Sequence, residues 1–114
     1  MGIGNLDINY YLDINGIIDG ITFSNLANAA TATVKINNNI VSANIIDFYT
    51  AYPPGTSYEV TIRPNIGYLF VDSNNTGHYS GVLNEHIAIT PSLKSVNYYL
   101  DLNGNLDGVD SGSL

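Results

Sequence analysis

A twelve-residue segment near the start of the chain recurs near its end. Residues 9–20 read NYYLDINGIIDG and residues 97–108 read NYYLDLNGNLDG, so nine of twelve positions are identical at an offset of 88 residues. We call these segments the N-terminal copy and the C-terminal copy. A near-copy at such a spacing is typical of repeats whose unit is one small domain. We therefore expect a single domain over residues 1–114. Residues 9–96 would form one repeat unit, and residues 97–114 the start of a second copy or a terminal hairpin.

Each copy begins with the alternating pattern of a half-buried strand. In the N-terminal copy, the apolar Leu12 and Ile14 flank the polar Asp13, as in a strand with one face toward a core. The Asn15-Gly16 pair that follows tolerates positive φ, which a type I′ hairpin turn requires. The pattern predicts a hairpin that turns at Asn15-Gly16, and the same turn at the equivalent position of the C-terminal copy.

The same segment has a second interpretation, because its oxygen-bearing side chains follow a D-x-N-x-x-x-D spacing. Carboxylate and amide oxygens spaced in this way can surround a calcium ion. The match to an EF-hand loop is incomplete, since Ile17 stands where such a loop has a further oxygen ligand, and neither copy has the glutamate expected at its twelfth position. Both interpretations stay open on the sequence. The candidate calcium ligands are Asp13, Asn15, Asp19, Asp101, Asn103 and Asp107.

Amides and hydroxyls, rather than charges, supply most of the polarity of the chain. Sixteen Asn, eight Thr and nine Ser stand against only 11% charged residues. Asn and Thr are poor helix formers, whereas the fourteen Ile and nine Tyr favour strands. The composition therefore predicts an all-β chain.

Short alternating segments separated by turn signals run through the middle of the sequence. Residues 31–36 form one such segment, and the Asn-rich residues 37–39 form the turn that ends it. The last two predicted strands cover residues 78–88 and 93–102. In total we expect seven or eight strands, the number typical of an immunoglobulin-like, two-sheet antiparallel β-sandwich.

The charge balance and the lack of cysteine exclude several classes of protein. The formal net charge of −7 argues against binding to nucleic acid or to an anionic membrane, because both need a basic patch. Without cysteine, neither disulfides nor a cysteine-type zinc site can stabilise the fold. We find no signal-peptide pattern and no membrane-spanning run. The chain is expected to be a piece of a secreted protein, or a protein released without a signal, as phage virion proteins are on lysis.

A series of short motifs follows in a characteristic order over most of residues 9–102. The motifs are Leu12-Asp13, Asn15-Gly16, residues 37–39, Phe48-Tyr49, Pro54-Gly55-Thr56 with Tyr58, and Tyr79-Ser80-Gly81. In this order they resemble a repetitive module of large secreted or surface proteins and prophage-type structural proteins of anaerobic gram-positive gut bacteria. The sequence departs from that module at Lys35 and Asn38, where the family tends to have Tyr and Gly. The resemblance implies an immunoglobulin-like, non-enzymatic module and names no ligand.

Tyrosines beside amides raise the alternative of a carbohydrate-binding module. Sugars present C–H faces to aromatic rings and hydroxyl groups to amides and carboxylates. Tyrosines also serve as cross-strand pairs in a sandwich, so a purely structural role is the competing interpretation. The candidate ligand-binding residues are Tyr49, Tyr52, Tyr68, Asn74, Asn75, His78 and Tyr79.

The sequence favours a structural role over catalysis. The chain has two histidines, no cysteine and no nucleophile elbow, which argues against a catalytic triad. We expect a non-enzymatic structural or display module on a virion, a cell surface or a secreted protein, mediating adhesion or assembly without a cofactor other than calcium. Its partner would be a protein or glycan surface, not nucleic acid or membrane. The C-terminal copy, residues 97–108, suggests a homo-oligomer formed by strand exchange.

Overall fold

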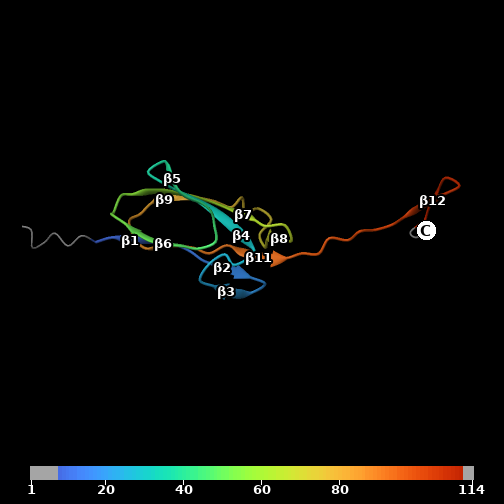
Figure 1. Cartoon of the computed structure of the whole chain (residues 1–114), viewed down its shortest axis with the longest axis horizontal. Coiled ribbons are helices and arrows are strands. Elements are labelled where there is room, and N and C mark those ends of the chain that lie inside the picture. Colours follow the sequence, from blue (N-terminus) through green and yellow to red (C-terminus); the bar gives the residue numbers. More distant parts are fainter. Residues whose placement is uncertain (1–7, 112–114) are drawn as a thin grey trace, which may run out of the picture.

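The computed structural model describes residues 8–111, which form strands joined by turns and loops, with no helix in that range (Figure 1). The prediction of an all-β chain is confirmed. Among these residues there is accordingly no helix that could cross a membrane. Three sheets build a body that ends near residue 96, and a separate two-stranded hairpin follows it.

One layer of the body is an antiparallel sheet with the strand order β5-β4-β7-β9. Its strands are β4 (Ala30–Ile36), β5 (Asn39–Ile45), β7 (Ser57–Pro64) and β9 (His78–Val82). The burial of β4 alternates strictly between buried and half-buried residues, as its sequence predicts. The predicted Asn-rich turn joins β4 to β5, with φ of 49° at Asn37 and 68° at Asn38.

The opposite layer consists of two sheets whose central strands follow one another along the chain. The first sheet has the order β10-β1-β6 and the second β3-β2-β11-β8. Their strands are β1 (Tyr10–Ile14), β6 (Phe48–Tyr52), β10 (Ile87–Ile89), β2 (Gly16–Ile18), β3 (Ile21–Phe23), β8 (Tyr68–Phe70) and β11 (Ser92–Ser95). The chain passes from β1 straight into β2, and from β10 into β11 across two residues. The body is therefore two-layered, with β4, β5, β7 and β9 facing the other strands (Figure 1).

The first two strands of the body, β1 and β2, run parallel to its last two, β10 and β11. Leu12 is the register partner of Ile87 on β10, and Ile17 is the partner of Ser92 on β11. Between these pairs, the Asn15 N–H donates to the Ile89 carbonyl at 2.8 Å. The continuous ladder joins the two sheets of this layer, with β1 between β6 and β10.

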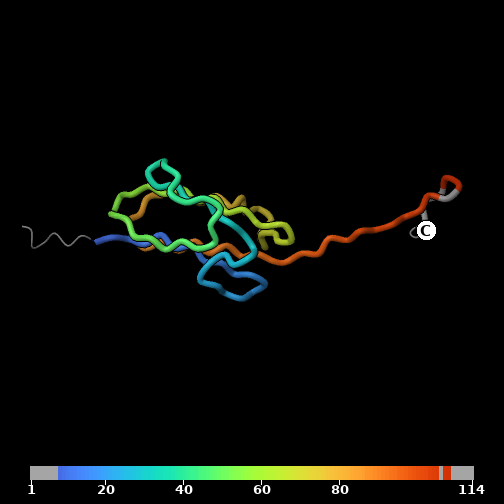
Figure 2. The backbone as a smooth tube through the Cα atoms, in the orientation of Figure 1, coloured from blue at the N-terminus to red at the C-terminus, as the bar shows by residue number. Residues whose placement is uncertain are grey.

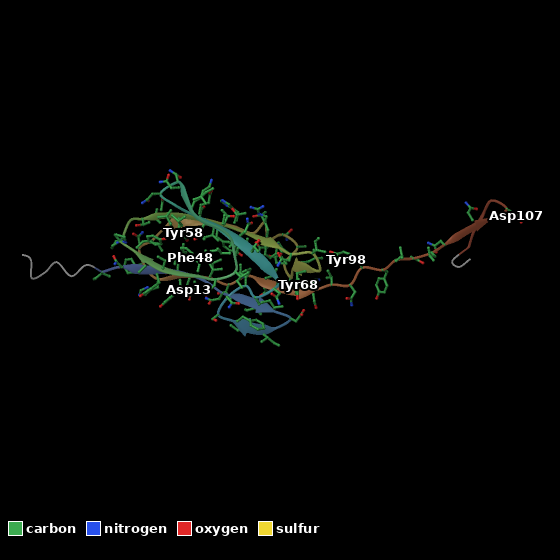
Figure 3. All side chains as sticks on the ribbon, in the orientation of Figure 1. Asp13, Phe48, Tyr58, Tyr68, Tyr98 and Asp107 are labelled. Carbon is green, nitrogen blue, oxygen red and sulfur yellow. The ribbon has the colours of Figure 1, made fainter. Side chains whose placement is uncertain are left out.

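The core lies between the two layers and is apolar. Leu12 and Ile14 of β1 belong to the same cluster as Val34 of β4 and Val60 of β7, and the labelled Phe48 lies between the layers (Figure 3). Burial of each such side chain stabilises the fold by about 1.5–3 kcal/mol. The largest fully buried side chains are Leu12, Ile14, Leu26, Ile62, Leu83, Leu93, Val34 and Val60.

The predicted turn at Asn15-Gly16 is wrong. Gly16 is the buried first residue of β2, where a Cβ atom would lie 2.9 Å from the carbonyl oxygen of Asn25. Glycine is needed here for a close approach of two backbone segments rather than for a turn. The hairpin instead turns between β2 and β3, where φ is 52° at Asp19 and 82° at Gly20. Two consecutive positive φ values are those of a type I′ turn.

The described residues contain thirteen strands instead of the expected seven or eight. Two of the predicted long strands are divided or cut short. The strand expected over residues 78–88 becomes β9 and β10, because residues 83–86 leave the sheet. The strand expected over residues 93–102 ends at Ser95, since residues 96–103 form no strand.

The C-terminal copy projects from the body as an extended segment (Figure 2). Val96 is half-buried and its N–H donates to the carbonyl of Gly67 at 2.9 Å. From residue 97 the chain runs outward to a hairpin of β12 (Gly104–Leu106) and β13 (Val109–Ser111). The molecule measures 89 × 28 × 21 Å, and this segment extends along its longest axis (Figure 2).

Candidate functional site

Aromatic and polar side chains gather on the outer side of β1 and β6. Because Leu12 points into the core, its neighbours Tyr11 and Asp13 point outward. Tyr49 of β6 is the register partner of Asp13, and its ring stacks on that of Tyr11, with centroids 4.2 Å apart and an interplanar angle of 6°. Such a stacked pair is worth about 0.5–1.5 kcal/mol beyond its burial. We call Tyr11, Asp13, Tyr49 and His86 the aromatic surface.

His86 extends this surface from the loop before β10. The backbone N–H of Tyr11 donates to its Nδ1 at 3.0 Å. Its ring lies 5.7 Å from that of Tyr11 and meets Tyr10 edge-on at 5.6 Å. Because Nδ1 accepts a hydrogen bond, the neutral imidazole carries its proton on Nε2. His86 therefore offers a hydrogen-bond donor beside two stacked tyrosine rings.

A shallow hollow of about 310 Å³ lies over the aromatic surface. Its remaining lining comes from Ile87 and Ala88 of β10. It thus combines apolar rings with a carboxylate acceptor and an imidazole donor, the groups that recognise the C–H faces and hydroxyls of a sugar. Tyr49 is 62% exposed, so its outer ring face is open to a ligand.

The other predicted ligand-binding residues do not form one surface. His78 and Tyr79 are adjacent on β9 and differ in exposure, as alternation requires: His78 is exposed and Tyr79 half-buried. Asn75 and Tyr79 do come together, since the Asn75 amide donates to the Tyr79 hydroxyl at 3.1 Å. Asn75 also accepts from the Gly77 N–H at 2.8 Å, so it shapes the loop that contains the exposed Asn74.

Tyr68 and Tyr52 are placed in the opposite layer from β9. Tyr68 is half-buried on β8 and pairs with Ser95 of β11. Tyr52 is half-buried at the end of β6 opposite Tyr10, and burial raises the pKa of Tyr52 above its ordinary value of 10.0. Of the predicted binding residues, Tyr49 alone belongs to the aromatic surface.

A separate charged group lies on the outer face of β4, β7 and β9. Glu59 accepts a hydrogen bond from His78 at 3.0 Å and forms an ion pair with Lys35 at 3.5 Å. The hydrogen bond with His78, followed by the positive charge of Lys35, lowers the pKa of Glu59 below its ordinary value of 4.5. All three side chains are about half exposed, so the pairs contribute little to stability.

The candidate calcium ligands of the N-terminal copy have separate surroundings. Asp13 lines the hollow beside β6, whereas both carboxylate oxygens of Asp19 are bound to Ser95, at 2.9 Å from its N–H and 2.9 Å from its hydroxyl. Among the side chains that the structure describes, no three His, Cys, Asp or Glu form a group suited to a metal ion. Calcium binding stays a prediction without support from this arrangement.

The C-terminal copy presents a second candidate site, because its apolar residues lack the surroundings of their counterparts. Leu12 and Ile14 are 0% and 1% exposed, whereas the equivalent Leu100 and Leu102 are 92% and 67% exposed. Figure 3 shows Tyr98 and Asp107 on the projecting segment, beyond the body. The hairpin part is nevertheless the same in both copies, since φ is 52° at Asp107, as it is at Asp19.

Sequence reasoning missed Tyr11 and His86 as parts of the aromatic surface. The outward position of Tyr11 is implied by the alternation around Leu12. The position of His86 depends on the parallel pairing of β1 with β10. This pairing joins Leu12 to Ile87, which are 75 residues apart in the sequence, and no local pattern predicts it. Comparison with known proteins adds no relative: no family model, no curated protein and no solved structure matches the chain.

Proposed function

We propose that the protein is a non-enzymatic structural module that joins end to end with further modules of the same kind. Such an array would belong to a virion, a cell surface or a secreted protein, where it mediates adhesion or assembly. The observation that carries the proposal is the C-terminal copy itself. It repeats the first strand of the body and leaves that strand's apolar side chains, Leu100 and Leu102, in solvent.

The positions of the two copies suit an array. The N-terminal copy enters the body at one end of its long axis, and the C-terminal copy leaves near the other end (Figure 1). A following body that took residues 97–103 as its β1 would therefore continue in the same direction. Repeat proteins are stabilised by contacts between neighbouring units in this way.

We further infer that the body belongs to the immunoglobulin-like class. The two facing layers and the apolar core between them support this inference. The resemblance to repetitive modules of secreted, surface and prophage-type structural proteins points to the same class and to an extracellular location. The parallel pairing of β1 with β10 adds a feature that a purely antiparallel sandwich lacks.

A tandem chain tests the modular proposal. In this chain residues 9–108 are followed directly by residues 21–96, so that the C-terminal copy of the first body takes the place of residues 9–20 in the second. We expect both bodies to fold, which circular dichroism and amide exchange would report, and to lie end to end, which small-angle scattering would show. The matched control carries Leu100→Asp and Leu102→Asp at the junction and should leave the second body unfolded. A control that folds as well as its parent contradicts the proposal.

Carbohydrate binding is a second candidate function, and it is favoured by the aromatic surface. The exposed ring of Tyr49, the carboxylate of Asp13 and the Nε2 donor of His86 converge on one hollow. A pyranose ring could stack there while its hydroxyls bind the two polar groups. The two functions are compatible, because an array would display many copies of the same surface.

A further inference from the structure

We infer that the C-terminal copy is a strand donor that acts between molecules, and that its acceptor is a second copy of this body whose first-strand site is vacant. The first-strand site is the position between β6 and β10 that residues 10–14 fill in the described structure. This inference rests on the modular function proposed above and names the partner of the exposed segment. Near-identity of the two copies and the contrasting exposure of Leu12 and Leu100 carry it.

The acceptor contacts follow from the register of β1. Leu100 would take the place of Leu12, between Thr50 of β6 and Ile87 of β10. Leu102 would take the place of Ile14. Apart from Leu102, the segment from residue 97 to residue 104 is identical to its counterpart, so the acceptor would receive nearly the same side chains and backbone hydrogen bonds.

The geometry excludes donation within one molecule. To occupy its own first-strand site, Leu100 would have to lie beside Ile87. The preceding strand β11, however, ends at Ser95, eight residues beyond Ile87, which corresponds to about 26 Å along the strand direction. The five residues from Ser95 to Leu100 can span at most about 18 Å. The C-terminal copy can therefore reach only the site of another molecule or of a following module.

The C-terminal copy can bind only to an acceptor whose first-strand site is empty. If the C-terminal copy of one molecule displaced the N-terminal copy of another, it would release nearly the same apolar side chains that it buried. The exchange would gain almost nothing from burial and would lose translational freedom. The unmodified chain is accordingly expected to stay monomeric, and donation to appear once the acceptor's own first strand is disabled.

The test uses two full-length chains. The acceptor carries Leu12→Asp and Ile14→Asp, which vacate its first-strand site, together with Leu100→Asp and Leu102→Asp, which disable its own donor segment. The donor is the unmodified chain. We expect the acceptor alone to be unfolded. Mixing it with the donor should give a folded one-to-one complex of twice the 12.3 kDa mass of one chain, whereas a donor carrying Leu100→Asp and Leu102→Asp should give none.

The register of the complex is tested by disulfide trapping, since the chain has no cysteine of its own. Asp13 pairs with Tyr49 in β1 and β6, so Asp101→Cys in the donor should crosslink to Tyr49→Cys in the acceptor. Ala51→Cys, two residues along the same strand, is the matched control and should crosslink at least tenfold less. The inference is overturned if the acceptor stays unfolded with the donor, folds without it, or crosslinks equally at both positions. The tandem chain would still report on the modular function.

Discussion

Leu12 and Leu100 occupy equivalent positions in two nearly identical segments, yet Leu12 is completely buried and Leu100 is 92% exposed. The difference does not come from the segments themselves, because residues 9–13 and 97–101 have the same sequence. It comes from β6 and β10, which lie on either side of the N-terminal copy and are absent around the C-terminal copy.

This pair gives a first prediction on stability. Leu12→Ala should lower the free energy of unfolding by about 2–5 kcal/mol, because it removes buried methyl groups and leaves a cavity. Leu100→Ala should change it by less than about 0.5 kcal/mol, since the side chain is in solvent. Urea denaturation of both variants measures the difference. Equal losses would mean that residues 97–103 pack against a body in solution.

A second prediction concerns the two equivalent turns. Asp19→Asn should destabilise the body by about 1 kcal/mol, because it replaces the two charged carboxylate acceptors of the Ser95 hydrogen bonds by one neutral amide oxygen. Asparagine still tolerates the positive φ at this position, so the turn itself should persist. Asp107→Asn, in the turn beyond the body, is the control and should leave thermal denaturation unchanged. A similar effect of both substitutions would show that the two hydrogen bonds between Ser95 and Asp19 are not the cause.

The third prediction is a dependence of stability on acid. Glu59 has a lowered pKa because of its hydrogen bond with His78 and the charge of Lys35. A carboxyl group whose pKa is lower in the folded than in the unfolded state stabilises the fold above the unfolded value of 4.5. That contribution is lost as the pH falls from there through the lowered folded value. Glu59→Gln should flatten the fall in stability over this window, and Glu85→Gln, which removes one carboxylate elsewhere, should not.

A fourth prediction tests the aromatic surface as a sugar site. Tyr49→Ala should weaken binding of soluble oligosaccharides by roughly tenfold, the effect of losing one aromatic platform worth about 1.4 kcal/mol. Tyr99→Ala is the matched control, because Tyr99 is 94% exposed on the projecting segment. Calorimetric titration against a panel of oligosaccharides measures both. If no sugar binds the unmodified chain, the carbohydrate alternative fails and the structural module stands alone.

A fifth prediction concerns calcium. The melting temperature should be the same with millimolar calcium and with chelator, because Asp19 already uses both carboxylate oxygens on Ser95, while Asp13 lines the hollow beside β6. A rise in melting temperature with calcium would contradict this expectation. Asp101→Asn and Asp13→Asn would then show which copy holds the ion.

Several elements of the fold follow from short-range patterns in the sequence. The alternation of apolar and polar residues predicts which face of residues 10–14 is buried, and Leu12 and Ile14 are indeed in the core. The Asn-rich residues 37–39 predict the turn between β4 and β5. These predictions succeed because strand alternation and turn geometry depend on neighbouring residues alone.

Other elements depend on contacts between residues far apart in the sequence, and local patterns predicted these elements wrongly or not at all. Asn15-Gly16 has the composition of a hairpin turn, but pairing with β10 and β11 keeps the chain extended through it. The aromatic surface is assembled in the same way, since His86 reaches Tyr11 through the parallel ladder. Cross-strand pairing at such separations leaves no local signature.

Comparing the two copies distinguishes the effect of the local sequence from the effect of tertiary contacts within one chain. Both form the same hairpin, β2–β3 and β12–β13, with φ of 82° and 80° at Gly20 and Gly108; the sequence by itself determined this, because a type I′ turn needs only its own residues. Whether residues 10–14 and their counterparts become a strand was decided by the tertiary structure. A strand satisfies its backbone and buries its apolar face only between partners, and β6 and β10 are present for one copy and not for the other.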